Sequence, residues 1–336
     1  MRKHVTIANN QASGDVLMLT AAVRDLHRCQ PGKFVTGVRT SCMELWENNP
    51  WVTALEEVPI ANNQSPIVGG ADCQLPNAEE IVCEYPLIHD SNARPVHFLQ
   101  GFTEFLSERL GCRIVPMEFK GDIHLSEEER SRPSPVAEVF GFEGPYWIVV
   151  AGGKRDYTIK WWSPERWQAV VDAFEGRIQF VQVGSLEDAH PLLDGVLDMR
   201  GKTTIRELIR LVYRASGVVS PVTFLMHLSA AVECAPGMPE SRPCVVVAGG
   251  REAPHWEAYP THQFIHTVGS LDCCRTGGCW RSRTVPLGDG DVKDRPKNLC
   301  VDVVRRDTEV LPRCMEMISA RAVIERIELY LQSKPI

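Results

Sequence analysis

The chain has 336 residues, of which 44% are hydrophobic and 24% charged, as in ordinary soluble globular proteins. Its net charge of -7 disfavours a generic nucleic-acid binder, because such proteins rely on basic surfaces. Since no apolar run approaches the roughly 20 residues that span a bilayer, we expect no membrane span. Residues 1–5 lack the apolar core of a signal peptide, so we expect a cytoplasmic protein of two domains.

Strand and helix patterns alternate through the first 110 residues. Residues 4–8, 33–38 and 81–84 predict strands, whereas 16–28 and 96–110 carry apolar residues at helical spacing. This alternation predicts an α/β fold with mostly parallel sheets. Residues 126–135 are charged and contain two prolines, so we expect a linker there and a domain boundary between about 126 and 145.

A second α/β unit begins after this boundary. Its predicted strands are residues 146–151, 178–183, 218–219 and 244–248. Its predicted helices begin at the Ser163-Pro164 pair, at a capping box from Thr204 to Glu207, near Thr223, and after Ser319. Ligands of such sheets bind at the carboxyl ends of the strands, so the loops that follow these strands are the candidate site.

Two loops that follow predicted strands carry polar candidates. Asp15 begins a helix after the first strand, where it is either a general base or a plain helix cap. In the second domain, Gly152 and Gly153 allow close approach of a ligand, and Lys154 and Lys160 supply cations suited to phosphate. A surface turn with solvated charges is the alternative for that segment.

Two further loops are weaker candidates. Thr223 precedes an apolar helix that contains His227, and the free N–H groups of that helix could hold an anion. A lone histidine on an apolar helix is more often a core residue than a ligand. The segment from Gly249 to Tyr259 follows a strand and is rich in glycine, aromatic and polar groups, which fits either a binding loop or an ordinary one.

Cysteines crowd into the C-terminal part of the chain, whereas others, such as Cys73, are scattered through the first half. Thiolates at such spacing can form a closed tetrahedral site for zinc or a single iron, with a structural role; free thiols are the alternative. Of the adjacent residues Cys273 and Cys274, only one is needed as a ligand, and Cys274 is the favoured one. The metal would be held by four of the five clustered residues Cys273, Cys274, Cys279, Cys300 and Cys314.

Taken in order, these segments resemble glycosyltransferase family 9, the ADP-heptose heptosyltransferases. The resemblance rests on residues 13–26, 160–167, 201–208 and 226–231. Gly152-Gly153-Lys154, Gly249 to Glu252 and the cysteine cluster are similar to the bacterial autotransporter branch, whose members hold a structural iron. The resemblance implies a GT-B fold, with two Rossmann-like domains facing across a cleft, and favours iron over zinc.

The resemblance also implies domain limits and residue roles. Residues 1–140 would bind the acceptor, residues 141–318 the nucleotide sugar, and the helix 319–336 would pack back on the N-terminal domain. Asp15 would be the catalytic base. The donor would be contacted by residues of the second domain, namely Gly153, Lys154, Lys160, Glu207, Thr223, Met226 and His227.

The implied reaction is an inverting transfer of heptose from ADP-heptose to a hydroxyl of protein Ser/Thr or of a glycan. It needs no catalytic divalent metal, and the sequence leaves oligomeric state open. One departure stands out: the family has Asp and Gly where this chain has Val222 and Phe224. Because of that departure, the alternative function is a non-catalytic GT-B scaffold whose fold is stabilised by a structural metal.

Overall fold

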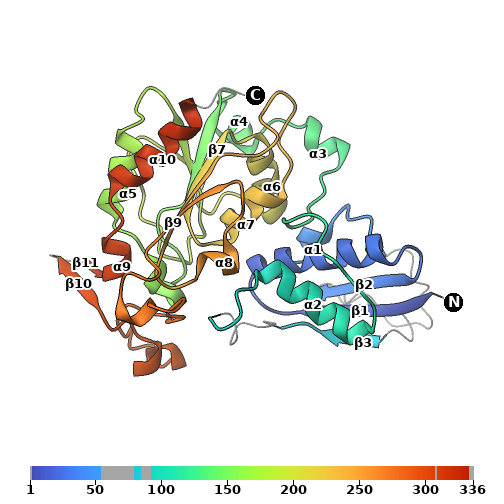
Figure 1. Cartoon of the computed structure of the whole chain (residues 1–336). Coiled ribbons are helices and arrows are strands. Elements are labelled where there is room, and N and C mark those ends of the chain that lie inside the picture. Colours follow the sequence, from blue (N-terminus) through green and yellow to red (C-terminus); the bar gives the residue numbers. More distant parts are fainter. Residues whose placement is uncertain (1, 54–78, 85–91, 307–308, 333–336) are drawn as a thin grey trace. The chain divides into compact units, whose positions relative to one another are not determined.

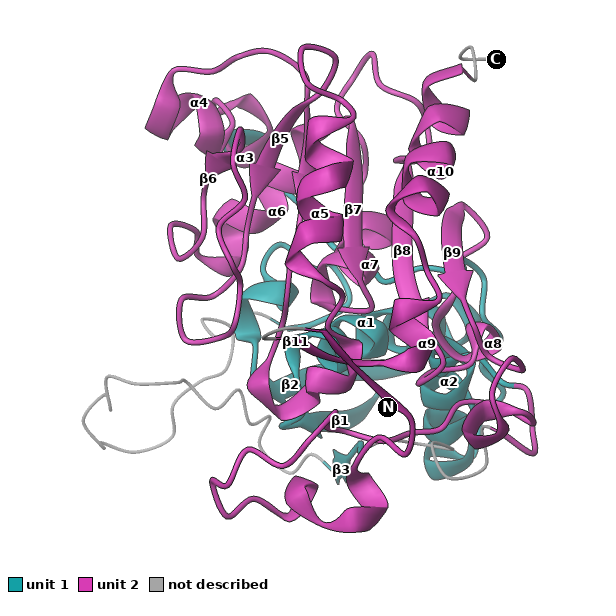
Figure 2. Ribbon diagram, turned by 90° about the vertical axis from the view of Figure 1, so that its left-hand side faces the viewer, with its two compact units in different colours: residues 1–88, 96–128 teal, residues 89–95, 129–336 magenta. Residues whose placement is uncertain are grey.

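The computed structural model describes residues 2–53, 79–84, 92–306 and 309–332, so Cys73 and residues 333–336 of the expected last helix lie outside the described part. The chain divides into two compact units, coloured separately in Figure 2. Unit 1 comprises residues 1–88 and 96–128, and unit 2 comprises residues 89–95 and 129–336. The division therefore places the short segment 89–95 with the C-terminal unit.

Unit 1 is a small parallel sheet with two long helices (Figure 1). Its strands run in the order β2-β1-β3, with β1 at Lys3–Asn9, β2 at Phe34–Thr40 and β3 at Glu79–Val82. The helices α1 (Ser13–Cys29) and α2 (Phe98–Leu110) pack against one another. The predicted apolar face of α1 is confirmed, since Val16, Leu19, Val23 and Leu26 are all buried.

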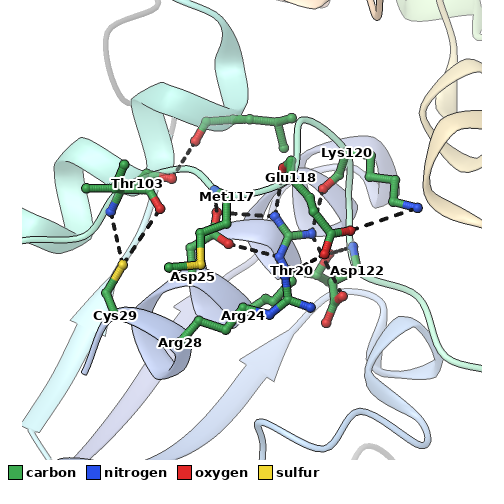
Figure 3. A network of polar contacts seen from close by, with 12 residues as sticks. Thr20, Arg24, Asp25, Arg28, Cys29, Thr103, Met117, Glu118, Lys120 and Asp122 are labelled. Carbon is green, nitrogen blue, oxygen red and sulfur yellow. Dashed lines mark hydrogen bonds and ion pairs between the residues drawn. The ribbon is translucent and has the colours of Figure 1, made fainter. Parts of the chain in front are cut away.

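A buried arginine fastens α1 to the segment that follows α2 (Figure 3). Arg24 is fully buried, and its Nε and Nη2 donate to the two carboxylate oxygens of Asp25 at 2.9 and 3.2 Å. The guanidinium also donates to the carbonyls of Glu118 (2.7 Å) and Lys120 (3.0 Å). Because a buried charge needs both a counter-ion and hydrogen bonds, these contacts fix residues 118–120 on α1.

Unit 2 is built on a six-stranded parallel sheet of order β6-β5-β4-β7-β8-β9. The strand order reverses between β4 and β7, which is the switch point of a doubly wound fold. Of these strands, the sequence did not predict β6 and β9. The strands are β4 (Tyr146–Val149), β5 (Gln179–Gln182), β6 (Leu197–Asp198), β7 (Gly217–Pro221), β8 (Cys244–Gly249) and β9 (His262–His266).

Helices cover both faces of this sheet. On one face α5 (Pro164–Asp172) and α10 (Ala320–Gln332) lie side by side, as Figures 1 and 2 both show. The other face carries α6 (Ile205–Arg214) and α7 (Phe224–Ala231), where the hydroxyl of Tyr146 donates to the carbonyl of Leu211 at 2.8 Å. The predicted helix starts at Ser163-Pro164, at the Thr204 capping box and after Ser319 are confirmed.

One expectation from the sequence needs correction, and another agrees with the structure. The last helix was expected to pack on the N-terminal domain, but Val323 and Ile327 of α10 are buried in the core of unit 2. The division of the units between residues 128 and 129 lies within the predicted boundary of about 126–145, and the linker at 126–135 contains a short helix, α3 (Glu127–Ser131). An ion pair holds α3 in place, because Arg206 lies 2.6 Å from the carboxylate of Glu129.

The remaining elements are short and lie mostly in the loops of unit 2. A polar clamp also lies among these loops: the Asn92 side chain bonds to the N–H and C=O of Gly278 at 2.9 and 2.8 Å. No helix in the described ranges is long and apolar enough to cross a membrane. The short elements are η1 (Met43–Trp46), α4 (Pro135–Phe140), η4 (Arg155–Lys160), α8 (Pro254–Glu257), η5 (Asp272–Cys274), η6 (Val292–Asp294), η7 (Pro296–Asn298), β10 (Val303–Arg306), β11 (Glu309–Pro312) and α9 (Arg313–Glu316).

The Arg24 network predicts a large stability effect. Arg24→Leu leaves the Asp25 carboxylate buried without its counter-ion, so we expect the free energy of unfolding to fall by about 3 kcal/mol in urea titrations. The matched control is Arg321→Leu, because Arg321 forms only an exposed pair with Glu325. That control should change stability by less than about 0.5 kcal/mol; equal effects of the two variants would contradict the role given to Arg24.

Candidate active site

The loops that follow β4, β7 and β8 form the carboxyl edge of the sheet in unit 2. Residues 150–154 lead from β4 into η4, residues 222–223 lead from β7 into α7, and residues 250–253 lead from β8 into α8. The first two flank the switch point, where loops of doubly wound sheets diverge and leave room for a ligand.

Lys160 joins all three loops. It ends η4, and its Nζ lies 3.4 Å from the carbonyl oxygen of Val222, the residue between β7 and the cap of α7. The same Nζ lies 2.8 Å from Oε1 of Glu252, in the loop after β8. The structure therefore brings together three segments that the sequence analysis singled out separately.

Three cations surround the ring of Tyr157 in η4. The distances to the ring centroid are 5.6 Å for Nζ of Lys160, 4.9 Å for Cζ of Arg251 and 5.8 Å for Nζ of Lys293. These separations are those of cation–π contacts. A concentration of positive charge at a strand-end edge has the electrostatic character of an anion-binding site.

Lys293 reaches this position because of a charged loop that the sequence analysis did not single out. The fully buried Arg283 pairs with Asp289 at 2.8 Å and Asp294 at 2.5 Å, which closes the loop on itself. Lys293 then bonds to Asp156 of η4 at 3.2 Å. The alternation of Asp and Gly at 289–291 was the available sequence signal for a tight polar loop.

The glycine pair after β4, Gly152 and Gly153, allows a close backbone contact with Ala189. The N–H of Gly153 donates to the carbonyl of Ala189 at 3.0 Å, and the N–H of Ala189 donates to Gly153 at 3.2 Å. Gly152 has φ +112°, and a Cβ there would lie 1.9 Å from the Ala189 oxygen. The amide of Gly153, which we expected to face the donor, is thus engaged with Ala189, while Lys154 is exposed at the start of η4.

The start of α7 differs in part from expectation. Thr223 is its N-cap residue, but its side chain forms no cap hydrogen bond, and Oγ1 is buried without a partner among the described residues. Met226 is fully buried. His227 is also buried, with Nδ1 3.0 Å from the hydroxyl of Tyr259, so its imidazole belongs to the interior of unit 2.

His227 is one member of a buried polar cluster that links α7, α8 and β9. Its Nε2 lies 3.9 Å from Oε2 of Glu257, and the rings of Tyr259 and His262 are 5.0 Å apart. Burial raises the pKa of Tyr259 well above its usual value and lowers the pKa of His262 to about 3. Both side chains are therefore neutral near pH 7.

Two further expected site residues take part in helix capping. Glu207 completes the capping box of α6: its Oε2 accepts from the N–H of Thr204 at 2.7 Å, and this backbone bond lowers the pKa of Glu207. In unit 1, Asp15 lies in the first turn of α1 and is 8% exposed. Its Oδ2 accepts from the N–H of Ala12 at 3.0 Å, so Asp15 bonds back to the N-cap residue Ala12 from the third position of α1 and is not itself the N-cap that the sequence allowed as an alternative to a base.

The clustered cysteines gather around the loop after β8. The N–H of Cys279 donates to the carbonyl of Gly250 at 3.1 Å, and a Cβ on Gly250 would lie 3.1 Å from the sulfur of Cys274 and 3.2 Å from Cβ of Cys314. Within the described part of the chain, however, no group of three or more His, Cys, Asp or Glu side chains has the arrangement of a metal site. The expected cysteine-bound metal is therefore not seen as a formed site.

Part of the chain is similar to a known protein family. Residues 91–235 match the family model "Glycosyltransferase family 9 (heptosyltransferase)". This match covers less than half of the chain, and it agrees with the family resemblance that the sequence motifs gave. No curated protein matches the sequence.

Solved structures share the fold of this chain. A family 9 glycosyl transferase from Veillonella parvula has a TM-score of 0.63 at 16% identity, with 98% of each chain covered. ADP-heptose LPS heptosyltransferase II of E. coli has a TM-score of 0.58 at 12% identity, covering 97% of this chain and 98% of that one. These likenesses agree with the predicted α/β fold of the GT-B heptosyltransferases.

A third similar structure carries further information in its description. The dodecameric, iron-containing heptosyltransferase TibC from enterotoxigenic E. coli was solved in complex with ADP-D-β-D-heptose. Its TM-score is 0.61 at 16% identity, and the match covers 99% of this chain and 78% of that one. TibC thus has a segment beyond the part that this chain matches.

The buried His262 predicts how stability depends on pH. In the unfolded chain the imidazole takes up a proton near pH 6.5, whereas in the folded chain it does so only near pH 3. The unfolded state therefore binds one more proton between these values, and stability falls as pH is lowered through this range. His262→Asn should flatten this slope by about 1.4 kcal/mol per pH unit in urea titrations between pH 4 and 6.

The exposed His4 provides the control for that measurement. His4→Asn should leave the slope of stability against pH as it is in the parent chain. A slope unchanged by His262→Asn would mean that the imidazole of His262 is already protonated in the folded state.

Proposed function

We propose that this chain transfers a heptose from ADP-heptose to a hydroxyl of a protein Ser/Thr or of a glycan. The observation that carries the proposal is the position of Lys160, whose ammonium lies where three strand-end loops of a doubly wound sheet converge. The diphosphate of a nucleotide sugar is the chemical group that such a site suits. The family description and the ADP-heptose complex of TibC favour heptose as the sugar.

The donor-binding part of the proposal concerns unit 2. Lys160 contacts the diphosphate, Lys154 adds a second cation from the exposed start of η4, and the amides at the start of α7 supply N–H donors near Thr223. Charge develops on the diphosphate as the bond to the sugar breaks, so preorganised cations and N–H groups lower the barrier. Glu207, Met226 and His227 support this region from α6 and α7, with Glu207 toward the nucleoside.

The acceptor-activating part concerns unit 1. Asp15 takes the proton of the acceptor hydroxyl while its oxygen attacks the anomeric carbon from the face opposite to ADP. The new glycosidic bond forms as the bond from the anomeric carbon to the phosphate oxygen breaks, and ADP leaves with its electron pair. Since Oδ2 of Asp15 caps α1, proton transfer is assigned to Oδ1. General-base catalysis of this kind contributes roughly 10²–10⁴-fold.

A structural metal, with iron preferred, completes the proposal. The Cys314 thiol has a pKa raised to about 12 by burial, with the thiols of Cys279, Cys300 and Cys273 adding to the shift, so these four sulfurs are close enough to interact. The sulfur of Cys274 lies 3.6 Å from the carbonyl of Thr267 and interacts with Cys273, but it is not among the thiols that shift the pKa of Cys314. This favours Cys273 over Cys274 as the ligand, the reverse of the preference from sequence.

The backbone around these thiols also suits a bound cation. Backbone N–H groups of Arg281 and Gly250 lower the pKa values of Cys279 and Cys314, while the sulfur of Cys300 lies 3.1 Å from the carbonyl oxygen of Asp302. Such amides stabilise thiolates in metal–sulfur sites. A tetrahedral iron would hold the loop after β8 in place and take no part in catalysis.

Two broader attributes belong to the same proposal. A cytoplasmic location follows the sequence expectation and the chemistry of a nucleotide-sugar donor. Assembly into a homo-oligomer is proposed because TibC is described as dodecameric.

The proposed roles of Asp15 and Lys160 are separable by experiment. Asp15→Asn should lower the turnover of ADP-heptose, followed as ADP release with acceptor, by about 10²–10⁴-fold. It should leave the affinity for ADP, measured by calorimetry, within about twofold because the donor contacts lie in unit 2. Lys160→Met should instead weaken the binding of ADP, because Lys160 is proposed to contact the diphosphate. Near-normal turnover by both variants would refute these assignments, and absence of any heat with ADP would refute the donor.

The metal proposal predicts a difference between cysteines. Cys300→Ser should abolish the iron content of the purified protein, measured by mass spectrometry of the metal, and lower its thermal stability. Cys274→Ser is the matched control and should keep one iron per chain. A parent protein that folds fully with neither iron nor zinc would rule out the site.

A further inference from the structure

We propose that Glu252 is a positioning residue that holds Lys160 and Arg251 together as a two-cation clamp for the donor diphosphate. The proposal rests on the function proposed above and adds a residue whose role neither the sequence nor the comparisons assign. Glu252 is not required to touch the donor; it acts by fixing the ammonium of Lys160 beside Arg251. The three residues all lie in unit 2, so the clamp lies within one compact unit of the fold.

One carboxylate oxygen serves both cations. Oε1 of Glu252 lies 2.8 Å from Nζ of Lys160 and also accepts from Nη1 of Arg251. The side chain of Glu252 is 3% exposed, so water screens this interaction very little. The ammonium and the guanidinium are thereby brought to a single oxygen, which is the spacing needed to share an oxygen of a phosphate group.

The two cations need an anion between them to remain this close. Like charges near one oxygen repel strongly in a buried setting, and the N-terminal end of α7, beside Val222, adds further positive potential. Arg251 is anchored independently, because its Nε donates to the carbonyl of Arg281 at 2.7 Å and its guanidinium lies over Trp280 at 5.7 Å. Lys160 has a flexible chain, and its ion pair with Glu252 fixes its ammonium beside Arg251.

The backbone aims Glu252 at this point. Gly249 ends β8 with φ +65°, and a Cβ there would lie 2.4 Å from the sulfur of Met315. The loop can therefore follow this path only without a side chain at Gly249. Oε2 of Glu252 is buried and has no hydrogen-bond partner among the described residues. A buried carboxylate with one unsatisfied oxygen is costly for stability, which fits a residue kept for function.

The test measures binding of inorganic pyrophosphate and of ADP to the full-length protein by calorimetry. Glu252→Gln keeps the shape of the side chain and removes its charge, and we expect pyrophosphate affinity to fall about tenfold. Glu252→Asp keeps the charge and should recover part of this loss. In a Lys160→Met background, Glu252→Gln should cause no further loss, because Glu252 acts through Lys160.

Three outcomes would overturn the proposal: unchanged affinity in Glu252→Gln, tighter affinity, or the same loss with and without Lys160. Tighter binding would mean that Glu252 competes with the diphosphate. The control is Glu328→Gln, which removes the carboxylate from an exposed pair with Arg177 and should change nothing. Pyrophosphate binding without ADP binding would refute the ADP donor and still test the clamp, whereas a parent chain that binds neither refutes both.

Discussion

The ion pair between Lys160 and Glu252 is the interaction on which the rest of the candidate site depends. It connects η4, the start of α7 and the loop after β8, which are far apart in sequence and share only the carboxyl edge of one sheet. The reversal of strand order between β4 and β7 makes this meeting possible, because the loops at that point run in opposite directions. The carboxylate of Glu252 then fixes the ammonium of Lys160 at this edge of the sheet.

The position of Lys160 is also prepared by the core beneath it. Two residues further along the chain, Trp162 is buried, donates from Nε1 to the carbonyl of Ile318 at 2.9 Å, and packs edge-on against Trp167 with centroids 4.8 Å apart. These contacts hold the end of η4 against α5 and the C-terminal segment. The end of this short 3₁₀ helix, and Lys160 with it, thus gains rigidity from large buried side chains.

Much of the fold could be predicted from sequence because local patterns determine it. The apolar spacing of α1 and the reciprocal Thr204–Glu207 cap are both as expected. The partners of the candidate residues could not be predicted in this way. Lys293 reaches Tyr157 through a folded-back loop, and the Gly153 amide is occupied by Ala189, which only the three-dimensional path of the chain decides. Likewise α10 is amphipathic, but its pattern says nothing about which core receives it.

The Asn92 clamp has a consequence for dividing this molecule into pieces. Asn92 belongs to unit 2, and besides its two bonds to Gly278 it accepts from the indole N–H of Trp280 at 3.0 Å, yet the residues before and after its segment belong to unit 1. Severing the backbone after residue 128 would therefore not yield two complete modules. The C-terminal fragment would lose a strap that satisfies three polar groups beside the cysteine loop. A truncated protein that keeps unit 2 complete therefore has to include residues 89–95 together with the C-terminal half.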